Sequence, residues 1–297
     1  MWIVVTLVAT VFQTVRTAAQ GRLRSSLSVT AAGYVRYIFG APLAIAACVI
    51  ALRIDGSGLP PIPVRFWFIV TCAGIAQIVG TVALLTSFDR RDFAIGTVYS
   101  KSEVIQVAVF SAVIVGEPLR LFGWVAVGAV VTGVVILAAS AQAGASQRWR
   151  HIDRAARSGL AAGAGFALAA VGIRWASTSL GEAPSIIRAL ITLAAMNSIQ
   201  TVVNGVWLVR TERGAIRNIV AISRRTVPVG VLSVCGSAAW AIAMSLETAA
   251  KVRTLGQFEL LLTFVVSRVW LREPHTGREY AASGLVLAGI VAVVILG

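Results

Sequence analysis

Charged residues are scarce in this sequence. Asp, Glu, Lys and Arg make up 13% of its 297 residues, and 58% are hydrophobic, whereas soluble domains carry roughly 25% charged residues. A soluble fold of this size would lack the polar residues needed to cover its surface. The mean hydropathy of +0.85 therefore indicates an integral membrane protein. Ten spans of about 21 residues would use about 210 positions and leave only short loops.

Sequence patterns that carry catalysis or metal binding elsewhere are missing as well. The three cysteines all fall in apolar runs, without the spacing of a disulfide framework or a zinc site. There is no Walker A motif, no HExxH, no GxSxG and no histidine in an apolar run. We therefore expect no metal, no cofactor and no enzymatic activity. The net charge of +14 would suggest nucleic acid on a soluble chain, but without a binding motif it indicates basic loops beside anionic membrane lipid.

Long, continuous apolar runs dominate the chain. They lack the alternation of barrel strands, so they indicate helices. Glu117-Pro118 and Glu273-Pro274 each end a run, because proline cannot continue a helix cleanly. The sequence predicts an all-α integral membrane protein with ten transmembrane helices, at about residues 2–19, 27–52, 66–88, 93–115, 121–141, 158–179, 184–209, 226–249, 251–271 and 279–297.

The chain repeats itself at a spacing of 156 residues. This spacing aligns Glu103 with Glu259, the two Glu-Pro pairs with each other, and several glycines with glycines: Gly74 with Gly230, Gly80 with Gly236, Gly128 with Gly284 and Gly133 with Gly289. We expect two five-helix repeats, residues 1–141 and 158–297, joined by a basic loop at 142–157. Five is an odd number, so the second repeat must enter the membrane from the opposite side. The predicted architecture is an inverted five-plus-five helix repeat, which secondary transporters use for alternating access.

The basic residues of the connections are divided unevenly between the two predicted faces. The odd-numbered connections hold 15 arginines, and the even-numbered ones hold 5 basic residues when Arg253 is counted with them. The positive-inside rule then places the odd-numbered connections in the cytoplasm and both termini outside.

Two segments carry a family resemblance. Residues 96–103 (GTVYSKSE) lead to Gly116-Glu117-Pro118-Leu119, and residues 252–259 (VRTLGQFE) lead to Leu271-Arg272-Glu273-Pro274. With the ten-helix repeat, the chain resembles the drug/metabolite transporter superfamily, EamA type, over essentially its whole length. The resemblance implies a central cavity enclosed by helices 1–4 and 6–9, and termini in the cytoplasm, opposite to the arginine count. We expect a multi-pass protein of the bacterial cytoplasmic (inner) membrane.

Ionisable residues inside the apolar runs are functional candidates. A charge at bilayer depth costs at least about 2.5–3.5 kcal/mol and usually faces a cavity. Glu103 and Glu259 are the only acids deep in a predicted span. In a low dielectric a carboxylate favours its protonated form unless a cation pairs with it, so either glutamate could carry a proton. The alternative is a buried ion pair that fixes helix packing.

The remaining candidates line the predicted helices. In helix 1, Gln13, Arg16, Thr17 and Gln20 form one stripe, which predicts a cavity wall or hydrogen bonds to another helix. Arg36 and Arg188, which align at a spacing of 152, could bind a carboxylate or phosphate, or could instead pair with Glu259 or Glu103.

Helical geometry constrains the candidates near the two glutamates. Lys101 and Glu103 lie about 200° apart on a regular helix, and so do Gln257 and Glu259. We therefore expect Lys101 to lie on the side of Thr97 and Gln257 on the side of Arg253. Trp240 is deep enough to be a cavity wall. The predicted substrate-binding set is Gln13, Arg16, Arg36, Lys101, Glu103, Arg188, Trp240, Arg253, Gln257 and Glu259.

These features favour a secondary transporter of a small organic solute, anionic or zwitterionic because the in-span charge is mainly positive. An amino acid or another metabolite fits, and coupling to protons through the glutamates is a possibility that the sequence leaves open. The alternatives are a multidrug exporter, a channel or non-transporting membrane protein, and a membrane-embedded enzyme. The expected partners are the solute and membrane lipid, as a monomer or a homodimer.

Overall fold

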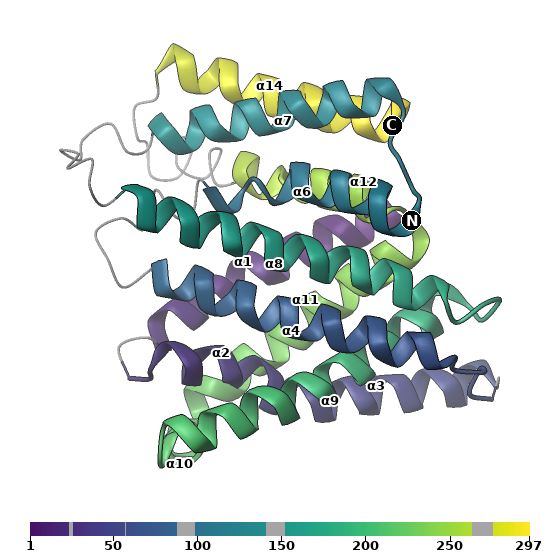
Figure 1. The fold of residues 1–297 in the computed structure, drawn as a ribbon, viewed down its shortest axis with the longest axis vertical. Helices are drawn as coiled ribbons and strands as arrows, with labels where there is room; N and C mark the ends of the chain where they lie inside the picture. The colour runs from purple at the N-terminus through teal and green to yellow at the C-terminus, as the bar shows by residue number, and fades with distance from the viewer. Residues whose placement is uncertain (24–25, 57, 88–98, 141–151, 263–275) are drawn as a thin grey trace. The chain divides into compact units, whose positions relative to one another are not determined.

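The computed structural model describes residues 1–23, 26–56, 58–87, 99–140, 152–262 and 276–297 (Figure 1). Within these ranges no strand occurs, so the predicted all-α class is confirmed. The elements are α1 (Trp2–Leu23), α2 (Val29–Ile38), α3 (Gly40–Asp55), α4 (Val64–Ser87), α6 (Glu103–Phe110), a π-helical turn (Ser111–Val115), α7 (Leu121–Ser140), α8 (Ile152–Thr178), α9 (Ser185–Thr211), α10 (Ala215–Ala221), α11 (Ser223–Leu246), α12 (Ala249–Leu255) and α14 (Gly277–Leu296).

Six helical stretches of the described residues are long and apolar enough to cross a membrane. They are Val29–Asp55, Val64–Leu84, Arg157–Thr178, Ser185–Thr211, Ser223–Leu246 and Gly277–Leu296. Shorter apolar helices cover Trp2–Thr17, Glu103–Val115 and Leu121–Leu137. Each of the ten predicted runs therefore contains helix where the structure describes it. The ten-span architecture itself stays a prediction.

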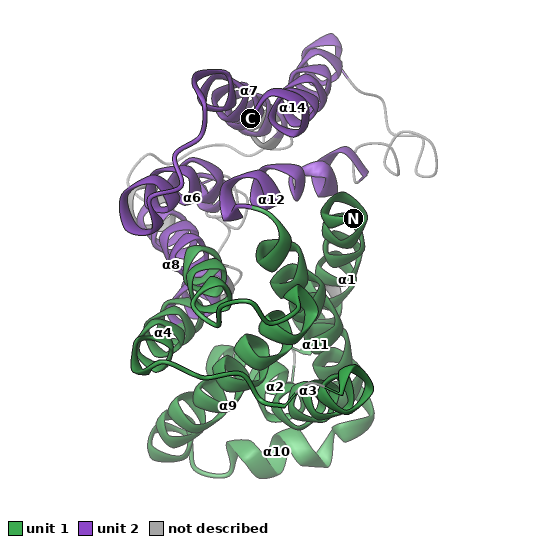
Figure 2. Ribbon diagram, turned by 90° about the vertical axis from the view of Figure 1, so that its right-hand side faces the viewer, with its two compact units in different colours: residues 1–78, 169–247 green, residues 79–168, 248–297 purple. Residues whose placement is uncertain are grey.

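The helices form two compact units, coloured separately in Figure 2. Unit 1 comprises residues 1–78 and 169–247, and unit 2 comprises residues 79–168 and 248–297. Each unit takes helices from both predicted repeats, and α4 and α8 contribute residues to both units. The boundaries of the predicted repeats stay a prediction, and most of the expected basic loop at 142–157 lies outside the described residues.

Unit 1 is built around α11, which contacts α1, α2, α3 and α9. Glycines allow the close approaches. A Cβ atom at Gly205 of α9 would lie 2.6 Å from the hydroxyl oxygen of Tyr34, and one at Gly230 of α11 would lie 2.4 Å from Cβ of Phe39. Helix association in a membrane depends on such close packing, because lipid is as apolar as the side chains and supplies no hydrophobic driving force.

Three predicted helices are interrupted, which corrects the expectation of continuous runs. The run at 27–52 breaks at Phe39, between α2 and α3. Pro42 explains this break, because it has no N–H to donate to the carbonyl of Ile38 and its ring crowds that carbonyl. The runs at 93–115 and 251–271 are interrupted by turns at 101–102 and 256–257. In the first of these turns the Ser102 hydroxyl donates to the Tyr99 carbonyl oxygen (2.6 Å), which competes with the helical backbone bond.

In unit 2, α7 and α14 pack antiparallel in a nearly two-fold symmetric way. A Cβ atom at Gly133 of α7 would lie 2.6 Å from Cγ2 of Val286, and one at Gly289 of α14 would lie 2.6 Å from Cγ2 of Val130. Gly133 and Gly289 are 156 residues apart, and so are Val130 and Val286. The spacing of the sequence repeat thus reappears as a local symmetry axis between these two helices.

Substituting these glycines tests that packing. Gly133→Ala and Gly289→Ala should each lower the free energy of unfolding by about 1–3 kcal/mol, because the new methyl group overlaps a neighbouring helix. Gly128→Ala and Gly284→Ala, on the same helices, are matched controls, since an added Cβ meets no described atom within 4 Å at either position. Titration of the purified protein into a denaturing detergent would measure the difference. Equal losses in all four variants would contradict the packing.

Candidate functional site

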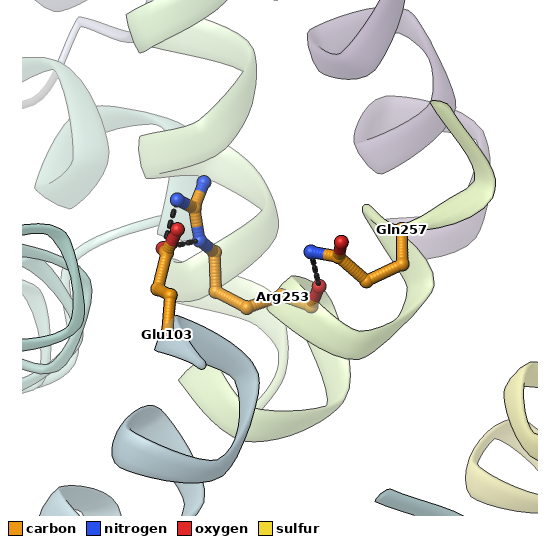
Figure 3. A network of polar contacts seen from close by, with 3 residues as sticks. All are labelled: Glu103, Arg253 and Gln257. Carbon is orange, nitrogen blue, oxygen red and sulfur yellow. Dashed lines mark hydrogen bonds and ion pairs between the residues drawn. The ribbon is translucent and has the colours of Figure 1, made fainter. Parts of the chain in front are cut away.

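An ion pair joins the two interrupted helices of unit 2. Glu103 is the first residue of α6, where the helix dipole favours a negative charge. The Nε and Nη2 atoms of Arg253, in α12, both donate to Oε1 of Glu103 (Figure 3). The side chains of Arg253 and Glu103 are only 12% and 10% exposed. A pair this well buried has strong electrostatic attraction because little water screens it.

The sequence analysis left open a pairing of Glu103 with Arg36 or Arg188, and the structure shows a different one. The partner of Glu103 is Arg253, and not Arg36 or Arg188. Arg253 lies inside α12, as does Lys251, although both were counted with the connections of the less basic face. At the repeat spacing of 156, Arg253 aligns with Thr97, so the sequence of the first repeat offers no cation for the equivalent bond to Glu259.

Gln257 lies beside this pair, as its spacing from Arg253 predicts. Its Nε2 atom donates to the carbonyl oxygen of Arg253 at 3.4 Å (Figure 3). The side chain is buried, and its Oε1 atom accepts no hydrogen bond from the described residues. Lys101 is half-buried at the other turn; Thr97, toward which it was expected to point, lies outside the described residues. The turn at 101–102 comes directly before Glu103, and the turn at 256–257 ends two residues before Glu259.

Gly163 of α8 packs against the interruption that precedes α6. A Cβ atom at this position would lie 3.0 Å from the carbonyl oxygen of Ser100 and 3.1 Å from the backbone nitrogen of Glu103. The glycine therefore lets α8 approach the broken backbone at the point where the carboxylate begins.

Five of the predicted site residues lie in unit 1: Gln13, Arg16, Arg36, Arg188 and Trp240. On α1, Nη2 of Arg16 donates to Oγ1 of Thr17 at 3.2 Å, and both residues are half-buried. Gln20, one turn further, donates from Nε2 to the Ala32 carbonyl oxygen at 2.8 Å. The stripe on α1 thus divides: Gln20 joins α1 to α2, as the structural alternative predicted, whereas Gln13 and Arg16 stay candidates for a cavity wall.

Arg36 and Arg188 occupy different local environments although they align in sequence. Arg36 is in the last turn of α2, is 7% exposed, and lies 5.2 Å from the centroid of the Tyr37 ring. Arg188 is in the first turn of α9 and donates to the Gly181 carbonyl oxygen (3.3 Å) and to Oγ of Ser185 (3.2 Å). The structure therefore places Arg36 in the interior of unit 1 and Arg188 at a helix start. Trp240 of α11 is buried at 8% exposure.

A buried glutamine escaped the sequence analysis. Gln200 of α9 is fully buried, and its Nε2 atom donates to the Gly74 carbonyl oxygen (3.1 Å) and to Oε1 of Gln77 (2.8 Å) on α4. Thr201 donates to the Tyr37 carbonyl oxygen at 3.0 Å. The signal was present: Asn197, Gln200, Thr201 and Asn204 are spaced i, i+3, i+4 and i+7, which is the stripe that was recognised only in helix 1.

The acidic residues of unit 1 lie outside the middle of its helices. Asp55, Glu182, Glu212 and Glu247 are all at helix ends or in a connection. Arg174 of α8 donates to the Met244 and Ser245 carbonyl oxygens near the end of α11, at 3.2 and 3.3 Å. The described residues contain no group of three His, Cys, Asp or Glu that could hold a metal.

Comparisons with known proteins agree with this membrane architecture. Residues 1–139 match the EamA-like transporter family, which confirms the resemblance drawn from residues 96–119. A protein of Sinorhizobium sp described as an uncharacterized transporter in the cobO 3′ region is 28% identical over 95 residues, or 31% of this chain and 67% of that protein. A solved structure described as "Crystal structure of protein" is similar with a TM-score of 0.70. The match covers 99% of this chain and 96% of the other chain, at 14% sequence identity. This last similarity shows the fold alone.

The ion pair of unit 2 predicts a double-mutant result. Arg253→Leu should lower the free energy of unfolding by about 3–5 kcal/mol, because it leaves the Glu103 carboxylate buried without its cation. Adding Glu103→Leu should restore much of that loss, since two apolar side chains tolerate the same site. Arg120→Leu, an exposed position of unit 2, is the control and should change stability by less than about 0.5 kcal/mol. Additive losses in the double variant would contradict a direct interaction.

Proposed function

We propose, from the match of residues 1–139 to the EamA-like transporter family, that this chain is a secondary transporter of a small anionic or zwitterionic organic solute. The family match supports a membrane transporter of the drug/metabolite type rather than an enzyme. The charge of the solute, the coupling and the alternating-access mechanism go beyond that match and are argued from the residues.

The observation that carries the substrate class is the cationic interior of unit 1. Arg36 is buried and Arg16 is half-buried, whereas the four acids of unit 1 lie at helix ends or in a connection. This excess of basic side chains within the helices favours an anionic solute. A guanidinium also matches the planar geometry of a carboxylate. A lipophilic cation, the usual substrate of a multidrug exporter, would be repelled by this environment.

Two pairs of helix contacts support the inverted repeat. The near two-fold contact of α7 with α14 relates residues 156 apart. In addition, a Cβ atom at Gly80 would lie 3.2 Å from the backbone nitrogen of Phe166, and one at Gly236 would lie 3.2 Å from Cβ of Phe12. Gly80 and Gly236 are 156 residues apart, and Phe12 and Phe166 are 154 apart. In each contact a glycine of one predicted repeat approaches a phenylalanine of the other, a pattern that two inverted copies of one unit favour.

The substrate assignment rests on Arg36 and can be tested there. With amino acids and carboxylated metabolites as a panel, a ligand would be found by thermal stabilisation of the purified protein. Arg36→Ala should then weaken its binding by about 10- to 100-fold, because a hydrogen-bonded charge contact is lost. Arg36→Lys should weaken it less, since the charge remains but the planar fork is lost. Arg53→Ala, at an exposed position, is the control. Tight binding of quaternary ammonium dyes that improves in Arg36→Ala would exclude an anionic substrate.

Proton coupling is the second part of this proposal. Protonation of Glu103 would neutralise its carboxylate and weaken the bond to Arg253, which would allow α6 and α12 to separate. Glu103→Gln mimics the protonated side chain, and Glu259→Gln removes the other in-span acid. In proteoliposomes the double variant should lose transport driven by a proton gradient while keeping solute counterflow. Undiminished gradient-driven transport in that variant would assign both glutamates to packing.

A further inference from the structure

Two sets of arginines differ in what they bind. Arg174, Arg188 and Arg253 donate hydrogen bonds to protein atoms. A second group lies on the segment from the end of α9 to the start of α11, and all its members are exposed. Their side chains form no hydrogen bond or ion pair with any described residue: Arg210, Arg213, Arg217, Arg224 and Arg225. Five cations within 16 positions therefore remain available for an external anion.

The short helix α10 holds this segment in place. Ala215 and Ile219 are buried and belong to one hydrophobic cluster with Leu23, Leu27 and Leu208. Arg217 is exposed, and so is Val220, at 54%. The helix is thus fixed by one apolar face while its remaining face carries a cation and an apolar side chain, the composition of a helix that lies in a membrane interface.

The position of the segment along the chain places it at the level of lipid headgroups. It directly follows α9, which is long and apolar enough to span the membrane, and precedes α11, which is as well. Trp207, one turn before the end of α9, is 61% exposed, and tryptophan favours the interface between lipid and water. The one acid of the segment, Glu212, accepts a hydrogen bond from the Ser28 hydroxyl. It therefore opposes an arriving anion less than a free carboxylate would.

We propose that α10 and its flanking residues, Arg210 to Arg225, form a binding surface for anionic phospholipid headgroups. The arginine forks match phosphate geometry, the burial of Ala215 and Ile219 orders the surface in advance, and exposed Val220 contacts the acyl boundary. The proposed lipid binding does not depend on which solute is transported. It is also more specific than a general excess of basic loops, because it assigns the binding to α10 and its flanking arginines.

Binding of short-chain phosphatidylglycerol to the purified full-length protein in neutral detergent tests the proposal. The triple variant Arg213→Gln, Arg217→Gln, Arg224→Gln should bind on the order of a hundredfold more weakly, because each basic residue near an anionic surface contributes roughly a fivefold factor. The control variant Arg53→Gln, Arg65→Gln, Arg120→Gln removes the same charge from exposed positions elsewhere and should bind as the wild type does. Native mass spectrometry would count the retained lipids.

A charge-preserving variant keeps the test decisive if the glutamine variant fails to fold. The triple variant Arg213→Lys, Arg217→Lys, Arg224→Lys should keep most of the phosphatidylglycerol binding. Equal losses in the α10 and control variants would overturn the proposal, because they would indicate a nonspecific charge effect. Inorganic phosphate that binds as tightly as the lipid would also overturn it in favour of a free-anion site, and so would unchanged lipid binding in the glutamine variant.

Discussion

A polar group in an apolar medium must find its partner inside the protein, and this constraint shapes the whole chain. It makes every described regular element a helix, because a helix satisfies its own backbone. It also explains where the buried polar side chains go. Gln200 bonds to the Gly74 carbonyl, Arg174 bonds to the end carbonyls of α11, and Arg253 bonds to Glu103. Where the helices are interrupted, the freed backbone groups lie within three residues of the candidate residues Arg36, Glu103 and Glu259.

Glycine is the second requirement for these interruptions. Gly163 lets α8 approach the turn before Glu103, and Gly230 lets α11 approach the break at Phe39, which follows Arg36 by three residues. A side chain at either position would displace the backbone that carries a charged candidate residue. The glycines therefore couple helix packing to the placement of the candidate residues within each unit, and substitutions at these glycines would alter that placement.

Periodicity and spacing predicted the parts of this protein that depend on local geometry. The helical runs, the contact of Gln257 with Arg253 and the close packing at Gly163 all follow from positions on one helix or from residue size. Partners that are distant in sequence could not be derived in this way. The bond between Glu103 and Arg253 requires knowledge of which helix faces lie together, and Arg253 looked like a loop residue because it sits near the start of its run. Helix α10 is too short and too polar to stand out as an apolar run.

The aligned repeats differ most where the charges are. At the spacing of 156, Lys101 aligns with Gln257 and Arg253 with Thr97, whereas the glutamates and several helix-contact glycines, such as Gly133 and Gly289, are the same in both. In the proposed inverted repeat, identical halves would give inward- and outward-facing states of equal energy, because exchanging the halves converts one state into the other. A bond such as that between Glu103 and Arg253, whose arginine aligns with Thr97 in the other half, removes this equivalence. A symmetric scaffold would then supply the two states, and the asymmetric charges would set the population of each and its response to a ligand or a proton.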